Sequence, residues 1–98
     1  MQELTKDQHG ILLAALAKWG PESQIGMANE ELGELITAMN QFKRGRISPT
    51  EFASEIADAH IMLHQLEIMF SLESEISDQV KLKMERLEGR VFGPKIKE

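Results

Sequence analysis

The chain of 98 residues has the length of one domain, and its 42% hydrophobic and 28% charged residues are typical of a globular protein in water. The net charge of −5 disfavours a polymeric nucleic acid as partner, since proteins that bind one normally carry a basic face. The sequence has no cysteine, no apolar run long enough to span a membrane and no basic-then-apolar signal pattern, so we expect a cytoplasmic protein without a membrane partner.

The first half of the chain predicts two helices separated by a glycine and a proline. Over residues 4–18, apolar side chains recur at helical spacing, and Trp19-Gly20-Pro21 then interrupts the pattern. A second helix is expected over residues 22–43, and the Arg44-Gly45-Arg46 stretch is typical of a helix end. The apolar stripe of this second helix consists of Met27, Ala28, Leu35, Ala38, Met39 and Phe42.

The third predicted helix has the clearest start in the sequence. Ser48 is a suitable N-cap, Pro49 fits the first helical position, and Glu51 can complete a capping box. The helical pattern then continues to about Phe70.

A fourth helix is expected from about Ser71, followed by an irregular tail from about Gly89 to Glu98. Its apolar stripe consists of Ile76, Val80, Met84 and Leu87. No segment alternates apolar and polar residues as a half-buried strand does. The sequence therefore predicts one all-α domain over residues 1–98, with an architecture similar to a four-helix bundle.

Glu31 and Glu55 lie in the apolar faces of their predicted helices. At about 100° of rotation per residue, each lies within roughly 20–40° of apolar side chains of the stripe. Each is followed three residues later by a second acid, Glu34 and Asp58 respectively. Two other acid pairs with this spacing lie largely away from the fourth helix's stripe and are expected to be surface charges: Glu75 with Asp78, and Glu85 with Glu88.

Four carboxylates that converged between two helices would repel one another strongly. At about 5 Å and an effective dielectric constant near 20, each pair costs roughly 3 kcal/mol. Such acids either hold protons, with raised pKa values, or hold a cation. An all-oxygen set of ligands suits Mg²⁺ or Mn²⁺, and Mg²⁺ in proteins commonly shares its coordination with substrate phosphates. The pattern therefore indicates a metal site that acts on a phosphate-bearing substrate.

Two other metal sites fit the sequence less well. A di-iron bundle needs a glutamate followed three residues later by histidine, and no glutamate in this chain has that neighbour. His60 and His64 have the i, i+4 spacing of a metal-binding pair, but they lie roughly 140–180° from Glu55. We interpret them as a surface or interface pair. Apolar residues on the same far side, including Ile61, indicate a second apolar face for a partner subunit.

Three motifs of the sequence resemble a known family. EELGE at residues 30–34 and EIAD at residues 55–58, with 20 residues between them, resemble the EExxE…ExxD signature of the MazG-like all-α nucleoside triphosphate pyrophosphohydrolases. KMERLEGRVFG at residues 83–93 is similar to the Lys-x-x-Arg region and the ending of MazG domains. The resemblance covers roughly residues 19–93.

This resemblance implies a MazG-type helical bundle that assembles as a homodimer or homotetramer. It implies Mg²⁺-dependent hydrolysis of a (deoxy)nucleoside triphosphate to the monophosphate and pyrophosphate, with Mn²⁺ as a possible substitute and a role in cleaning the nucleotide pool. The implied metal ligands are Glu31, Glu34, Glu55 and Asp58.

Further roles also follow from the resemblance. Glu30, with Glu31 and Glu34, would take part in catalysis, Glu30 by orienting the attacking water. The side chains of Lys83 and Arg86 would hold phosphate oxygens, and Trp19 would lie against the base.

Two other interpretations of the sequence stay open. The chain could be a helical assembly module that binds a nucleotide or a cation without turnover. It could also be a purely structural bundle in which Glu31 and Glu55 are protonated or exposed.

Overall fold

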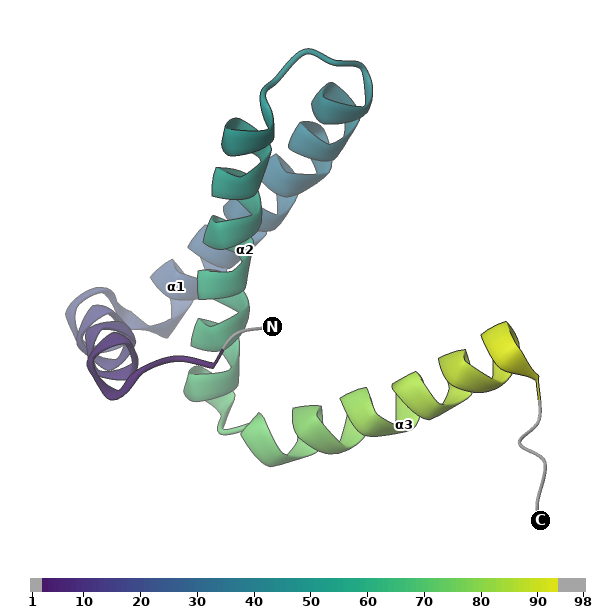
Figure 1. Ribbon diagram of the computed structural model, residues 1–98. Coiled ribbons are helices and arrows are strands. Elements are labelled where there is room, and N and C mark those ends of the chain that lie inside the picture. Colours follow the sequence, from purple (N-terminus) through teal and green to yellow (C-terminus); the bar gives the residue numbers. More distant parts are fainter. Residues whose placement is uncertain (1–2, 94–98) are drawn as a thin grey trace.

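The computed structural model describes residues 3–93, and all regular structure in this part of the chain is helical. The three helices are α1 (Lys6–Lys43), α2 (Pro49–Phe70) and α3 (Glu73–Phe92), as Figure 1 shows. The predicted all-α class is confirmed. None of the helices in the described part of the chain has both the length and the apolar character needed to cross a membrane.

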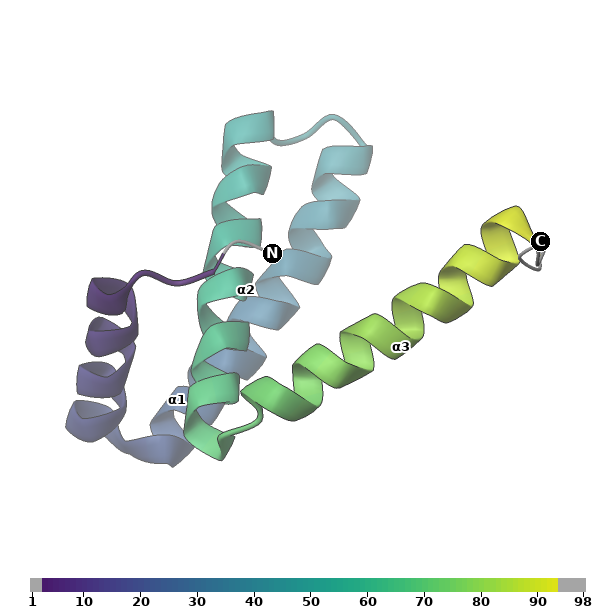
Figure 2. The same cartoon turned by 60° about the horizontal axis from the view of Figure 1, so that its bottom comes forward.

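Helix α1 is bent at Gly20, where the backbone is not helical (φ 83°, ψ 164°). Pro21 follows, and proline pushes the residue before it out of the helical conformation. The positive φ at this position favours glycine, which has no Cβ. The predicted interruption at Gly20-Pro21 is therefore confirmed as a bend between a first segment (6–19) and a second segment (21–43), which run in different directions in Figures 1 and 2.

The predicted start of α2 is also confirmed. The Ser48 hydroxyl accepts a hydrogen bond from the Glu51 backbone N–H, and the Glu51 carboxylate accepts one from the Ser48 N–H, both at 3.1 Å. Thr5 and Gln8 form the same reciprocal arrangement at the start of α1. Each of these caps satisfies backbone N–H groups that would otherwise have no partner in the first helical turn.

The second segment of α1 and α2 pack side by side and run antiparallel (Figure 1). The apolar residues buried in the described chain are few and mostly small: Leu12, Ala28, Ala38, Ala59 and Met62. Met27 and Met39, which the sequence predicted within the core stripe, are exposed instead. Only one helix faces the second segment, so the stripe that it buries is narrower than a bundle would bury.

Helix α3 continues through Gly89 to Phe92, so the predicted irregular tail is wrong for residues 89–92. A glycine inside a helix costs only about 1 kcal/mol relative to alanine, which is too little to end a helix that is otherwise favourable. The helix ends at Gly93, where φ is 79° and the N–H group bonds to the Gly89 carbonyl. The rest of the predicted tail lies outside the described residues.

Helix α3 projects away from the other two helices (Figures 1 and 2). It contacts the end of α2 and makes no contact with α1 within residues 3–93, and none of its described residues is buried. Its apolar stripe is exposed along its length, from Val80, with 55% of its surface accessible, to Val91, with 62%. The described chain is therefore a helical hairpin with an arm.

Candidate functional site

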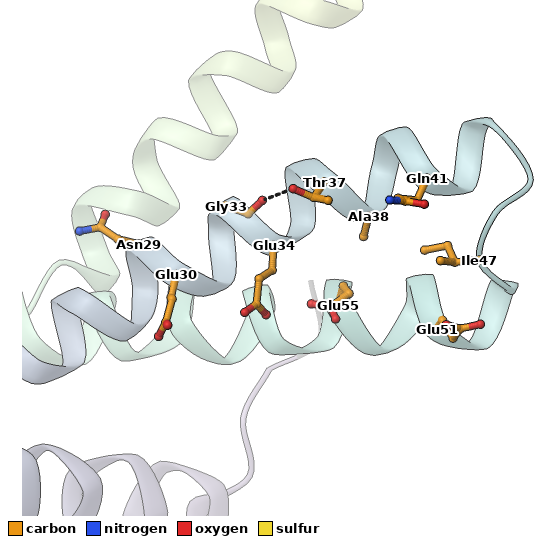
Figure 3. Close-up of a pocket in the computed structure, with 10 residues that line it drawn as sticks. All are labelled: Asn29, Glu30, Gly33, Glu34, Thr37, Ala38, Gln41, Ile47, Glu51 and Glu55. Carbon is orange, nitrogen blue, oxygen red and sulfur yellow. Dashed lines mark hydrogen bonds between the residues drawn. The ribbon is translucent and has the colours of Figure 1, made fainter.

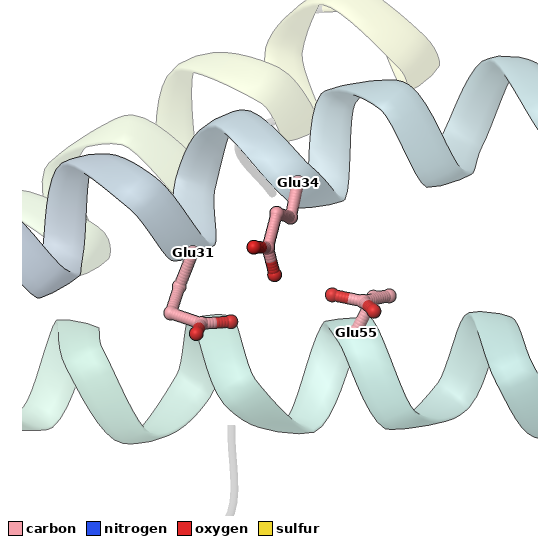
Figure 4. Close-up of side chains that lie close together, drawn as sticks. All are labelled: Glu31, Glu34 and Glu55. Carbon is pink, nitrogen blue, oxygen red and sulfur yellow. The ribbon is translucent and has the colours of Figure 1, made fainter.

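Three glutamates from two helices converge in the groove between the second segment of α1 and α2. One carboxylate oxygen from each of Glu31, Glu34 and Glu55 lies within 4.8 Å of the others. Figure 4 shows the two α1 side chains and the α2 side chain pointing toward one another. The spacing of three residues puts Glu31 and Glu34 on adjacent turns of one helix face, which is why both reach the same point.

The cluster has no internal compensation for its negative charge. One oxygen of Glu31 and one of Glu55 are shielded from solvent and have no hydrogen-bond partner. No lysine, arginine or histidine among residues 3–93 forms an ion pair with Glu31, Glu34 or Glu55. Buried polar atoms normally have a partner, so these two oxygens indicate a ligand or a proton that the protein side chains do not supply.

The electrostatics of the cluster act most strongly on Glu31. Partial burial, followed by repulsion from Glu34, Asp58 and Glu55, raises the pKa of the Glu31 carboxyl above its ordinary value. Asp58 is half-buried on α2, and its repulsion contributes to the raised pKa of Glu31. Its carboxylate does not belong to the group of three that converge.

A cavity of about 600 Å³ opens beside the cluster (Figure 3). Glu34 and Glu55 lie on its wall together with Glu30, which the sequence also marked as a candidate. The cavity extends along the groove to Ile47 and Glu51, near the start of α2. The cluster is therefore not sealed, because a molecule larger than an ion can reach it from this side.

Part of the cavity wall was not predicted from the sequence, namely Asn29, Thr37 and Gln41. Together with Gly33, they follow one another at four-residue intervals along α1 and form one row of the lining. The Thr37 hydroxyl donates a hydrogen bond to the Gly33 carbonyl at 3.3 Å, drawn as a dashed line in Figure 3. This i, i+4 row next to the acids was the signal available in the sequence.

Lys83 and Arg86 are not brought to the acids within one chain. Both are exposed on α3, which does not contact α1, and neither lines the cavity. Trp19 lies at the end of the first segment of α1 with 56% of its surface accessible. The Lys18 ammonium lies 5.2 Å from the centre of its ring, and Trp19 does not line the cavity either.

Three converging carboxylates without a basic partner can share protons or bind a hard cation. Neither protein-family models, nor curated proteins, nor solved structures give a significant match to this chain. The function is therefore inferred from the geometry of the acids and the cavity, together with the sequence motifs.

Proposed function

We propose that the chain is a Mg²⁺-dependent pyrophosphohydrolase of the MazG-like kind, which splits a (deoxy)nucleoside triphosphate into the monophosphate and pyrophosphate. The observation that supports this most is the convergence of Glu31, Glu34 and Glu55 with two buried oxygens that have no partner. The motifs at residues 30–34 and 55–58 contribute these same acids.

The donor atoms of the cluster fit a hard divalent cation. All are carboxylate oxygens, and the described side chains around them offer no positive charge. Glu31, Glu34 and Glu55 would hold Mg²⁺ or Mn²⁺, and Asp58 would complete the set from α2. When bound, the ion would neutralise phosphate charge and make a bound water more acidic.

The cavity gives the substrate a place beside this cluster. Its volume of about 600 Å³ is within the range of small-ligand sites, roughly 300–1,000 Å³. Glu30 lies on the wall and would orient the attacking water and accept its proton. The water oxygen would bond to the α- or the β-phosphorus, the bond from that phosphorus to the oxygen bridging the two would break, and the monophosphate and pyrophosphate would leave.

The homo-oligomeric state, as a dimer or tetramer with a bundle-like core, is part of the proposal. The accessible surface of the chain is 7918 Å², whereas a compact monomer of this mass has about 5,700 Å². The radius of gyration is 16.9 Å, compared with about 13 Å for a compact domain of this length. A second copy that covered the α3 stripe would remove much of this excess.

The same assembly would explain the position of the basic residues. Since Lys83 and Arg86 are on the arm, they would reach the acids of another copy rather than those of their own chain. Each site would then combine carboxylates from one copy with phosphate-binding side chains from another. The physiological role that fits this chemistry is cleaning of the nucleotide pool.

Incubation with a panel of nucleotides and Mg²⁺, with both products identified, tests the proposal. We expect monophosphate and pyrophosphate in equal amounts. Glu31→Gln and Glu55→Gln should each lower the rate by at least about a hundredfold, since a charged group near the reacting phosphate is lost. Glu75→Gln, which removes an exposed acid on α3, is the control and should retain full activity.

The non-catalytic alternative predicts a different result. A module that binds Mg²⁺ or nucleotide without turnover would show a higher melting temperature with its ligand but release no pyrophosphate. A purely structural bundle would show neither change.

A further inference from the structure

Two buried glutamines join three helical segments near the bend in α1. The Gln65 side-chain amide donates hydrogen bonds to the Gln24 side-chain oxygen and to the Leu12 backbone carbonyl, both at 2.9 Å. Gln65 is on α2, Gln24 on the second segment of α1 and Leu12 on the first. Gln65 is completely buried, and Gln24 has only 3% of its surface accessible.

The spacing of this glutamine pair matches the spacing of the acids on both helices. Gln24 lies seven residues before Glu31 on α1, and Gln65 lies seven residues after Asp58 on the antiparallel α2. The alignment that pairs the two glutamines therefore sets Glu31 opposite Asp58. The same alignment sets Glu34, three residues after Glu31 on α1, opposite Glu55, three residues before Asp58 on α2. Both belong to the cluster in the structure.

One other contact between the two helices is specific: the rings of Phe42 on α1 and Phe52 on α2 stack with their centroids 4.7 Å apart, at the other end of the hairpin. Between these rings and the glutamines, the buried apolar side chains are three alanines and Met62, which fit several alignments because alanine has little shape and methionine adapts. The acids repel one another and therefore oppose this alignment when no cation is bound. A shift by one helical turn would separate the two glutamines and leave a buried amide without a partner, which is costly.

The pair is poorly explained as a device for stability alone. The Gln65 side-chain oxygen is buried and has no hydrogen-bond partner. A well-packed apolar pair would avoid that cost, whereas buried polar residues between helices are best known for fixing register.

We propose that Gln24 and Gln65 are positioning residues that lock the register of α1 against α2 and thereby hold the carboxylates of Glu31, Glu34 and Glu55 together. The effect on cation binding rests on the proposed function, but the effect on register does not. Replacing both glutamines by methionine, which is similar in length and unbranched, removes the hydrogen bonds and leaves no amide unpaired.

Spin labels measure the register directly. The chain contains no cysteine, so cysteines introduced at the exposed positions Asn40 and Ser54 carry the only labels. Labelled chains are diluted with unlabelled chains so that distances within one copy dominate. We expect one narrow distance for the parent protein and additional distances for Gln24→Met/Gln65→Met, displaced by about one helical turn of 5.4 Å along the axis.

Melting and manganese binding complete the experiment. The double variant should melt at the same or a higher temperature and bind Mn²⁺ at least tenfold more weakly, as measured by the loss of the free-ion resonance signal. Gln79→Met, on the exposed face of α3, is the control and should change neither quantity.

A double variant that keeps the single parent distance overturns the proposal, whatever its affinity for Mn²⁺. Failure of the parent protein to bind Mn²⁺ would instead count against the proposed function, and the distances would still decide the register. Gln24→Leu/Gln65→Leu repeats the test with a branched side chain. Loss of the folded state in both double variants would overturn the proposal, because the pair would then serve stability.

Discussion

Glu31 lies half-buried between two helices, next to three other acids. Its position was predictable because helical rotation alone puts it in the apolar stripe, and the same holds for Glu55. The glutamine pair was not predicted, although Gln24 lies two helical turns before Glu31 on the same face. Glutamine occurs in so many environments that its presence in a sequence does not predict burial or a hydrogen bond until the structure shows its partner.

The raised pKa of Glu31 makes stability depend on pH in a defined direction. Since the folded state binds the proton more tightly, the stability contributed by Glu31 is fully present below its unfolded pKa. It is lost as the pH rises through the raised folded pKa. Without metal, the advantage of Glu31→Gln over the parent protein should therefore be largest at neutral pH and disappear near pH 4, where the parent carboxyl is protonated in both states.

Thermal melting with a chelator, at a series of pH values, checks this expectation. The difference between the two proteins reports the Glu31 carboxyl together with its repulsion of Glu34, Asp58 and Glu55, because the other carboxyl groups are common to both. A parent protein that melts above Glu31→Gln at neutral pH without metal would contradict the repulsion described here. Added Mg²⁺ should raise the melting temperature of the parent protein more than that of Glu31→Gln.

At the scale of the helices, residues with strong local preferences were decisive for prediction. The Ser48-Pro49-Glu51 start and the Gly20-Pro21 interruption were found because caps and proline act within a few residues. The end of α3 was missed because both Gly89 and Gly93 are suitable residues at which a helix can end. Only the backbone conformation shows that Gly89 is helical and that Gly93, with its positive φ, ends the helix. Periodicity also could not reveal the direction in which α3 leaves α2.

The bend in α1 provides a paired test of two glycines. At Gly20, with φ of 83° and ψ of 164°, alanine would be strained, and Gly20→Ala should lower the free energy of unfolding by about 1–3 kcal/mol. Gly26 lies inside the helix, and an added Cβ there meets nothing within 4 Å. Gly26→Ala should therefore raise the free energy of unfolding by about 0.5–1 kcal/mol.

Chemical denaturation of both variants, with the slope compared to that of the parent protein, measures these changes. Equal changes in the free energy of unfolding for the two substitutions would show that the backbone conformation at position 20 does not require glycine. An unchanged free energy of unfolding in Gly20→Ala, with the bend retained, would show the same.

At the scale of the whole molecule, the chain exposes more surface than a compact domain of its mass. The sequence indicated a partner through a second apolar face on α2, and part of that face lies beside the chain's own first segment. Ile61 shares a small cavity with Ile11 and Leu12. The α3 stripe is the larger uncovered surface. Sequence patterns show that a face is apolar, but they do not show which element covers it.

Charge on the α3 stripe should dissociate the proposed oligomer. Val80→Asp together with Leu87→Asp puts two carboxylates where apolar contacts are expected, and unpaired buried charges are costly. Sedimentation velocity should show the parent protein as a dimer or tetramer and the variant as a monomer. Gln79→Asp adds a charge to the exposed part of the same helix and is the control. A parent protein that sediments as a monomer at high concentration would contradict the proposed assembly.

Shared sites can be tested by mixing inactive variants. If the acids of one copy work with Lys83 of another, then Glu31→Gln and Lys83→Ala, each inactive alone, should form mixed dimers with one intact site. After exchange of subunits, activity should recover to about a quarter of the parent value, since half of the dimers are mixed and each has one working site. No recovery, despite mixed dimers visible by native mass spectrometry, would place Lys83 and the acids in the same copy.

The exposed arm has a consequence for the lifetime of the protein in a cell. A helix whose only contact with another helix is at the end of α2 opens easily, so its amide hydrogens should exchange quickly in isolated chains and slowly in the proposed oligomer. Proteases cut preferentially where a chain opens. Newly made copies that have not yet met a partner would therefore be degraded first. The half-life of the protein would then increase with its concentration.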